Sequence, residues 1–411
     1  MLGSSIRSRE ARVERSYTDL GWLADETEIK VEILEPGFEL RTIIPPATTL
    51  YDCQLNWVED DGSVVLTDIG GQGEPGWNPK KGHGSVFKLH PDNRIEQIVP
   101  YGNTGRAMIM SSIKSPSNFG EYSNAIFPLG QLRPGRDGAH NTHALYWVPP
   151  GASWVEHYVV IPDSGSLNGG KSGALVGPGF GAPGTPEDGY LFVTSMYNCT
   201  MYKVTSTRRI WPYIVGDPAH CGTQFMPRRL YRAPESWGKL AGELICEGVA
   251  NHTFRTPAPM PGEARLVERP IFFRVQDNGE GREATLSEID ATGLQPVREE
   301  EGPGLVETYD RPMLAPEGFG PFGGQRFFVD LGSVNLMQTT MMPDGALPYD
   351  SVLYRIDKDG QRHVFARNLQ GGHPMIMFQG KRLIISWIGK SYSTGDFHYP
   401  DGSLHEIVYT G

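Results

Sequence analysis

The chain has 411 residues, of which 37 are Lys or Arg and 48 are Asp or Glu, so its formal net charge at pH 7 is −11. This acidic balance argues against a nucleic-acid partner, because nucleic acids are bound by clusters of Lys and Arg among aromatic residues. The sequence contains no apolar stretch long enough to cross a membrane, and its first residues, MLGSSIRSREARVERS, lack the apolar core of a secretory signal. We therefore expect a cytoplasmic protein with no membrane and no nucleic acid as partner.

A polar, charge-rich lead segment occupies residues 1–28, and a strand-like run, IKVEILEPGFELRTIIP, follows at residues 29–45. Beyond it, the 51 glycines and 33 prolines alternate with short aliphatic and aromatic runs. Such alternation is typical of turns between strands, and it shows no convincing helical periodicity. The four cysteines are widely spaced and form no C-x-x-C pair, so we expect buried, reduced thiols.

Five segments have the period-two character of strands on both sides of a turn, and each predicts a hairpin. They are Val86–Ile98, Leu145–Val160, Met201–Val215, Ile271–Ile289 and Val352–Ala366. Equivalent positions recur about every 50 to 80 residues, which fits four-stranded propeller blades joined by loops of variable length. Together with the C-terminal strand Ser403–Tyr409, they predict six such units.

A second repeat lies between the hairpins. The segment Ala315–Phe328 echoes Ala233–Ile245, and a looser copy runs from Ala182 to Val193. Each copy is a turn rich in Gly and Pro that leads into a short apolar strand, and repeated units of this kind must stack to bury their faces. Gly318–Gly323 fits the pattern G-x-G-x-x-G of dinucleotide sites, but a strand follows where that site requires a helix, so we interpret it as a turn.

The last unit is one strand short, because Ser403–Tyr409 is followed only by Thr410 and Gly411. The run at residues 29–45 is otherwise unpaired, and we expect it to complete this unit and to close a ring of sheets, which removes exposed sheet edges. The sequence thus predicts an all-β fold, a six-bladed β-propeller closed by the N-terminal strand. Residues 29–411 would form this single domain.

Three segments resemble the six-bladed propellers of the group that includes the NHL-repeat proteins and the senescence marker protein and gluconolactonase family. They are Leu55–Asp68, Gly84–Asp92 and Val352–Gly360. In the lactonase members of that group, a divalent cation lies on the propeller axis, held by a Glu, an Asn and an Asp. The present sequence lacks a clear E-G-P-x-W motif of that site, and Asp52 and Asn124 stand at the corresponding positions.

Histidines and carboxylates fall where the chain is expected to start and end strands on one side of the ring. First strands are expected to start near Asp52, Asn124, Ser172, His220, Glu307 and His373, and other loops return to the same side near Asp68, Asn198, His252, Asp330 and His398. Imidazoles on separate blades can ligate a divalent metal ion and leave positions open for water or substrate. Such an ion lowers the pKa of bound water or polarises a carbonyl group.

The sequence therefore predicts a divalent metal ion whose ligands are His220, His252 and His373. The candidates for a general base, or for a group that orients a ligand, are Glu307, Asp330 and Asp52. Substrate contacts are predicted for Asn124, for the apolar wall residue Trp387, and for Lys171, whose loop matches a phosphate-binding pattern without the helix that this pattern requires. A structural role, such as capping a strand end, pairing with Arg or packing in the core, stays open for each residue.

These residues predict a metal-dependent enzyme that acts on a small polar organic substrate, either a hydrolase of the lactone or ester type or a lyase. One alternative is a non-catalytic propeller that binds a peptide or a partner protein through its long loops. Another is a metal-free cyclase or condensing enzyme that uses one Glu as base, as the resemblance to the strictosidine synthase propellers implies. Metal content separates the first hypothesis from the others, while the substrate, the cation and the oligomeric state stay open.

Overall fold

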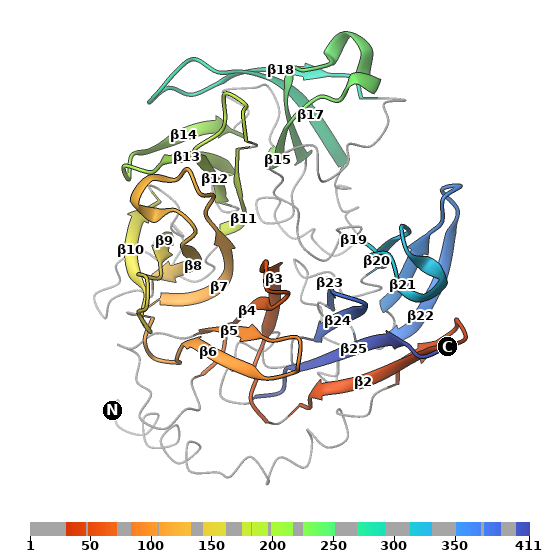
Figure 1. Cartoon of the computed structure of the whole chain (residues 1–411). Coiled ribbons are helices and arrows are strands. Elements are labelled where there is room, and N and C mark those ends of the chain that lie inside the picture. The colour runs from red at the N-terminus through yellow and green to blue at the C-terminus, as the bar shows by residue number, and fades with distance from the viewer. Residues whose placement is uncertain are drawn as a thin grey trace, which may run out of the picture. The chain divides into compact units, whose positions relative to one another are not determined.

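The computed structural model describes residues 30–46, 48–71, 84–104, 107–132, 143–161, 175–181, 183–195, 199–216, 225–250, 269–291, 313–330, 351–370, 374–387 and 400–411. In these ranges the chain forms short strands joined by turns, and the helical segments there are short 3-10 turns (Figure 1). The predicted all-β class is confirmed. No helix within the described ranges is long and apolar enough to cross a membrane. The lead segment at residues 1–28 lies outside them.

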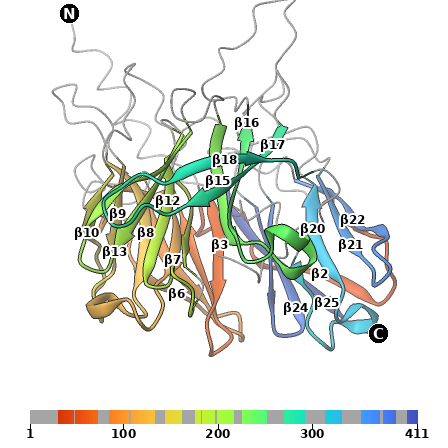
Figure 2. The ribbon, with the colours of Figure 1, turned by 90° about the horizontal axis from the view of Figure 1, so that it is seen from above.

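The chain divides into two compact units, and unit 1 comprises residues 1–111, 152–154 and 308–411. It holds three antiparallel sheets, whose strands can be followed in Figure 2. In sheet order, the strands are β3 (Cys53–Val58), β4 (Val64–Asp68), β5 (Ser85–Leu89) and β6 (Ile95–Val99) in one sheet; β23 (Met375–Gln379), β24 (Arg382–Trp387), β25 (Ser403–Tyr409) and β2 (Phe38–Ile44) in another; and β19 (Met313–Leu314), β20 (Arg326–Asp330), β21 (Ser351–Ile356), β22 (Arg362–Leu369) and β1 (Glu32–Ile33) in the third.

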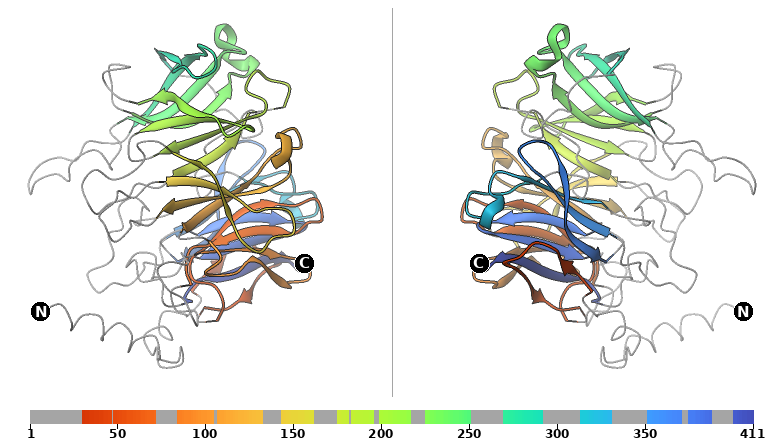
Figure 3. Two further views of the ribbon diagram at one scale, coloured as in Figure 1. Left: turned by 90° about the vertical axis from the view of Figure 1, so that its left-hand side faces the viewer. Right: turned by 90° about the vertical axis from the view of Figure 1, so that its right-hand side faces the viewer.

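Unit 2 comprises residues 112–151 and 155–307 and also holds three antiparallel sheets (Figure 3). In sheet order, they contain β7 (Ala107–Lys114), which begins before the unit boundary, β8 (Ile126–Leu132), β9 (His143–Trp147) and β10 (Glu156–Val160); β11 (Leu175–Phe180), β12 (Tyr190–Ser195), β13 (Thr200–Thr205) and β14 (Ile210–Val215); and β15 (Phe225–Arg232), β16 (Leu244–Ala250), β17 (Arg269–Gln276) and β18 (Thr285–Ile289). The prediction of a single domain over residues 29–411 stays a prediction.

In four sheets the four strands lie side by side in chain order, and we call them the first to the fourth strand. In the other two sheets the same order holds for β23 to β25 and for β19 to β22, and β2 or β1 from the N-terminal run is added after the last of them. The five predicted hairpins are confirmed as the third and fourth strands of five sheets, namely β5–β6, β9–β10, β13–β14, β17–β18 and β21–β22. Burial alternates along β17 and at the start of β21, as period-two patterning predicts, whereas β13 is buried on both faces. The chain therefore contains six meandering antiparallel sheets.

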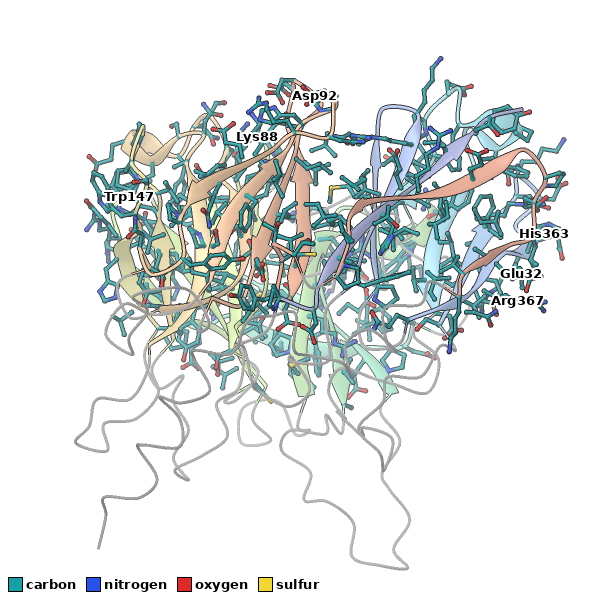
Figure 4. All side chains as sticks on the ribbon, turned by 90° about the horizontal axis from the view of Figure 1, so that it is seen from below. Glu32, Lys88, Asp92, Trp147, His363 and Arg367 are labelled. Carbon is teal, nitrogen blue, oxygen red and sulfur yellow. The ribbon has the colours of Figure 1, made fainter. Side chains whose placement is uncertain are left out.

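The N-terminal run supplies strands to two sheets of unit 1. As expected, β2 completes the last sheet by pairing with β25, with Phe38 opposite Tyr409. The sequence did not predict that β1 pairs with β22 in the preceding sheet, where Glu32 lies opposite Arg367. Figure 4 shows these two side chains together, and Arg367 Nη2 lies 2.8 Å from Glu32 Oε2. Closure of all six sheets into a ring stays a prediction.

The Gly- and Pro-rich repeats are the connections between first and second strands. In two copies the backbone N–H of the leading Ala donates across the turn, from Ala233 to Glu243 O and from Ala315 to Gln325 O, each over 2.8 Å. A third connection, from Ser115 to Ala125, makes the same bond over 2.9 Å, although the sequence analysis missed it.

Each of these three turns inserts an aromatic ring into the core beside a left-handed Gly. The rings belong to Phe119, Trp237 and Phe319, all of which are buried. The residue that follows each ring is Gly120, Gly238 or Gly320, with φ of 59°, 58° and 53°. Only glycine adopts this conformation without strain, which explains why the aromatic-Gly pair recurs.

Apolar side chains pack between neighbouring sheets of the same unit. In unit 1, Phe327 and Ile385 belong to a cluster shared by the sheets of β20 and β24. Leu55 and Ile384 belong to a second cluster, shared by the sheets of β3 and β24. Because Ile384 and Ile385 are consecutive residues of one strand, they mark its two opposite faces. The sheet formed by β23, β24, β25 and β2 is therefore buried on both faces.

Candidate functional site

The candidate site lies where two sheets of unit 1 meet. We call the end of a sheet where its first strand begins and its second strand ends the leading end. At the leading ends of the β3 and β23 sheets, Gly402 N donates to Leu50 O over 2.9 Å, and the Cys53 thiol donates to Ser403 O over 3.6 Å. A Cβ atom on Gly402 would lie 2.4 Å from Tyr51 O, so only glycine permits this approach.

Asp68, the last residue of β4, is fully buried and organises this end of the sheet. Its Oδ2 accepts hydrogen bonds from Tyr51 N over 2.8 Å and from the Tyr101 hydroxyl over 2.5 Å, and its Oδ1 accepts from Asp52 N over 2.7 Å. Burial raises the pKa of Asp68 in spite of these bonds. Asp68 thus holds the backbone of Asp52 in place.

Asp52 is brought to the start of β3 as the sequence predicted, and its side chain is fully buried. Its carbonyl oxygen accepts a hydrogen bond from Ile69 N over 3.2 Å, so its backbone is held on both sides. Burial, followed by the nearby carboxylates of Asp68 and Asp52, raises the pKa of the Cys53 thiol. Cys53 therefore stays protonated and cannot act as a thiolate nucleophile.

Trp387, the last residue of β24, lies in the same region, because its carbonyl oxygen is 4.0 Å from Cys53 Sγ. Its indole packs against the imidazole of His405, with ring centroids 3.9 Å apart. His405 is 0% exposed, its Nε2 is 2.9 Å from Ser403 Oγ, and its Nδ1 is 3.2 Å from Thr42 Oγ1. Burial lowers the pKa of His405 to about 4, so the ring is neutral at pH 7.

The sequence analysis did not assign His405 to the site. The missed signal is the alternation Ser403, Leu404, His405 at the start of β25, which places the two polar residues on one face. Ile385, the cross-strand partner of His405, belongs to the cluster shared with the sheet of β20, so this face of β25 is buried. The pairing of β2 with β25 brings Thr42 opposite His405.

Asn124 does not start a first strand, and this part of the prediction is wrong. The first strand of its sheet begins at Ala107, whereas Asn124 lies in the turn before the second strand, β8. Its side chain is exposed, and its φ is 56°. The physical reason is the turn from Ser115 to Ala125, which places Asn124 at the end of the sheet opposite to the leading end.

Asp330 ends the second strand β20, as expected for a returning loop, but it is not gathered with Asp52. Its side chain is 51% exposed, and Oδ2 lies 3.0 Å from Arg362 Nη2. Asp330 thus pairs with Arg on an exposed part of its sheet, which was the structural alternative for this residue.

The remaining predicted site residues, which are His220, His252, His373, Glu307 and Lys171, lie outside the described residues. Within the ranges that the structure describes, no group of three or more His, Cys, Asp and Glu side chains could hold a metal ion. Cys53, Cys199 and Cys246 are buried thiols outside any disulfide, as expected, and Cys221 is outside the described ranges.

Comparison with known proteins gives structural neighbours but no family. No protein-family model and no curated protein matches the chain. Similar solved structures include an α-L-arabinanase of Penicillium chrysogenum complexed with arabinobiose, at 12% identity over 89% of this chain and 97% of that chain, with a TM-score of 0.46. An α-L-arabinofuranosidase of Fusarium graminearum matches at 11% identity, over 90% and 96%, with a TM-score of 0.47.

A virginiamycin B lyase of Staphylococcus aureus is also similar, at 12% identity over 90% of this chain and 99% of that chain, with a TM-score of 0.36. These TM-scores are all below 0.5, and the architecture of the chain is defined by its own six sheets.

Proposed function

We propose that the chain is an enzyme that acts on a small polar organic substrate at the leading ends of its sheets, as a hydrolase of the lactone or ester type or as a lyase. The six sheets would be the blades of a closed propeller. The observation that carries the proposal is the pair of carboxyl groups of Asp52 and Asp68, both fully buried at the leading end of the β3 sheet. Next to it, the β23 sheet ends with a buried indole and a neutral imidazole, those of Trp387 and His405, on the face turned toward β20. Buried polar groups of this kind are typical of small-molecule sites.

Asp52 is the general base in this proposal. A carboxylate in hydrogen-bond reach of a water molecule can take its proton as the water attacks a carbonyl carbon, or it can take a proton from the substrate in an elimination. Asp68 is a positioning residue, because its oxygens accept bonds from the backbone around Asp52. Asp330 is a weaker candidate for the base, since it is exposed and paired with Arg362.

A divalent cation on His220, His252 and His373 remains part of the proposal on the strength of the sequence. When bound, such an ion would polarise a carbonyl oxygen or lower the pKa of a water molecule. Glu307 and Lys171 keep their proposed roles as an alternative base and as a contact for an anionic group.

Elemental analysis of protein purified without a histidine tag tests the metal. We expect one divalent ion per chain, lost in His220→Ala and His373→Ala without unfolding. Protein that is free of metal and fully active would contradict the proposed metal ion, while the proposal that the chain is an enzyme would stand.

Turnover of a panel of neutral lactones and esters, followed by acid release in a pH-stat, tests the reaction. Asp52→Asn should lower kcat at least a hundredfold, whereas the matched control Asp330→Asn should retain activity. No turnover of any panel member or of an elimination substrate would remove the enzyme hypothesis in favour of a binding protein.

A further inference from the structure

Three buried hydroxyl groups in the described residues have no hydrogen-bond partner. They are those of Thr194, Ser195 and Ser386, and each of these residues is 0% exposed. All three occupy the last two positions of a second strand, β12 in unit 2 and β24 in unit 1. A buried hydroxyl without a partner is unfavourable, because it has given up its bonds to water. Ser386 lies in the unit that holds the candidate base, and its unsatisfied hydroxyl indicates a partner that binds at that strand end.

Ser386 faces the sheet that carries the candidate base. Along β24, Leu383, Ile385 and Trp387 pack toward the sheet of β20, and Ile384 packs toward the sheet of β3. Since successive side chains of a strand alternate, Ser386 shares the face of Ile384. Its partner across the ladder, Met375, belongs to the same cluster as Cys53. Ser386 is thus directed into the space between β24 and the start of β3.

The charge of this region selects among possible ligands. Asp52 and Asp68 are both fully buried next to Cys53, and their carboxylates disfavour a further negative charge there. A carboxylate or phosphate group would meet repulsion in a region of low dielectric constant. A carbonyl or hydroxyl oxygen brings no charge and can bond to a serine hydroxyl.

We propose that Ser386 is a substrate-binding residue whose hydroxyl hydrogen-bonds a neutral carbonyl or hydroxyl oxygen of the ligand. This inference rests on the proposed function. It adds that the substrate group bound beside Asp52 is uncharged and that it contacts Ser386. Thr194 and Ser195 have the same feature in unit 2, which shows that it is not peculiar to one strand end.

The first test compares Ser386→Ala with Ser85→Ala in the unliganded protein. Ser85 is a matched control, because it is also 0% exposed but its hydroxyl donates to Val99 O over 2.6 Å and accepts from Gln97 Nε2 over 3.0 Å. Thermal unfolding should give a Tm for Ser386→Ala equal to or above that of the wild type, and a lower Tm for Ser85→Ala. An equal loss in both variants would overturn the inference, since Ser386 would then have an internal partner.

The second test uses D-ribonolactone, a neutral hydroxylated lactone, and its ring-opened anion D-ribonate as probes. We expect the lactone to raise the Tm of the wild type and of Ser85→Ala, and to bind Ser386→Ala at least tenfold more weakly in calorimetry. D-ribonate should produce no shift. If Ser386→Ala unfolds, Ser386→Cys replaces it, because this change keeps the unbranched side chain and puts a thiol, a weaker hydrogen-bonding group, in place of the hydroxyl.

Absence of any shift in the wild type, equal binding by wild type and Ser386→Ala, or equal binding of D-ribonate would overturn the inference. These outcomes are distinct from failure of the proposed function, which is decided by turnover in the Asp52→Asn series. If turnover is lost in Asp52→Asn but unchanged in Ser386→Ala, the proposed enzyme function stands and the proposed contact with Ser386 is wrong.

Discussion

The indole of Trp387 and the imidazole of His405 pack against one another at the leading end of the last sheet, with ring centroids 3.9 Å apart. The two residues come from neighbouring strands, β24 and β25. Because the imidazole lies between this ring and the hydroxyls of Thr42 and Ser403, it is shielded from water and neutral at pH 7. Protonation of His405 is therefore linked to the stability of the fold.

We predict that His405 makes the protein less stable in mild acid. Its pKa is about 4 in the folded chain and 6.5 in the unfolded chain, so the unfolded chain binds more protons between these values. Stability is fully present above pH 6.5 and is lost as pH falls toward 4, by up to about 1.4 kcal/mol per pH unit and about 3 kcal/mol in all.

Urea unfolding of the wild type and of His405→Gln between pH 4 and pH 7 measures this loss. The raised pKa of Asp68 has the opposite sign, because the folded chain then binds more protons, so the difference between the two proteins isolates His405. The control for the substitution itself is His157→Gln, which makes the same change at an exposed position. The same slope in His405→Gln as in the wild type would contradict the assignment.

Asp68→Asn should destabilise unit 1 by about 2 kcal/mol or more, because an amide has one acceptor oxygen and presents an NH₂ group to donors that now point at a carboxylate. Chemical denaturation gives the free energy of unfolding. Asp61→Asn is the control, since this exposed carboxylate makes a surface pair with Lys88 and the change should be much smaller. Comparable losses in the two variants would show that the buried bonds of Asp68 are unimportant.

Arg382→Ala should lower the free energy of unfolding by about 3 kcal/mol or more, because it leaves the carboxylate of Glu406 buried without its partner. Arg382 Nη1 lies 2.6 Å from Glu406 Oε2, and the two side chains are 13% and 9% exposed. Arg41→Ala removes the exposed pair with Glu39 and should cost less than about 1 kcal/mol. The comparison is made by urea unfolding, and it fails if both variants lose the same amount.

Gly320→Ala should destabilise the chain by about 2 kcal/mol or more, through a left-handed φ and through a steric clash. A Cβ atom at Gly320 would lie 2.6 Å from Tyr409 Cδ2. Gly360 has a φ of 79° with no atom within 4 Å of such a Cβ, so Gly360→Ala bears only the backbone penalty, about 1 kcal/mol. Thermal unfolding should give a lower Tm for Gly320→Ala than for Gly360→Ala. Equal Tm values would rule out the clash with Tyr409.

Much of the fold could be predicted from the sequence, because apolar and polar residues alternate along half-buried antiparallel strands. The hairpin of Val352–Ala366 and the completion of the last sheet by β2 were both predicted in this way. The pairing of β1 with β22 could not be, since the strand Glu32–Ile33 is too short to show a period.

The site was harder to predict. The alternation of apolar and polar residues locates a strand, but it does not show whether that strand is the first or the second of its sheet. Asp52 was placed correctly at the start of a first strand, whereas Asn124 precedes a second strand and lies at the opposite end of its sheet. His405 was not assigned to the site, because the packing of its face against the sheet of β20 depends on contacts between strands far apart in the sequence. Ser386 gives no signal at all, since a missing hydrogen-bond partner is visible only in three dimensions.

The division of the N-terminal run between two sheets has a consequence for how the chain is made. During synthesis β2 leaves the ribosome early, and its partner β25 is added only after nearly all the other strands. The strands β1 and β2 are therefore without their partners β22 and β25 while unit 2 is translated. Chaperones that bind unpaired strands would therefore be needed longest at β1 and β2.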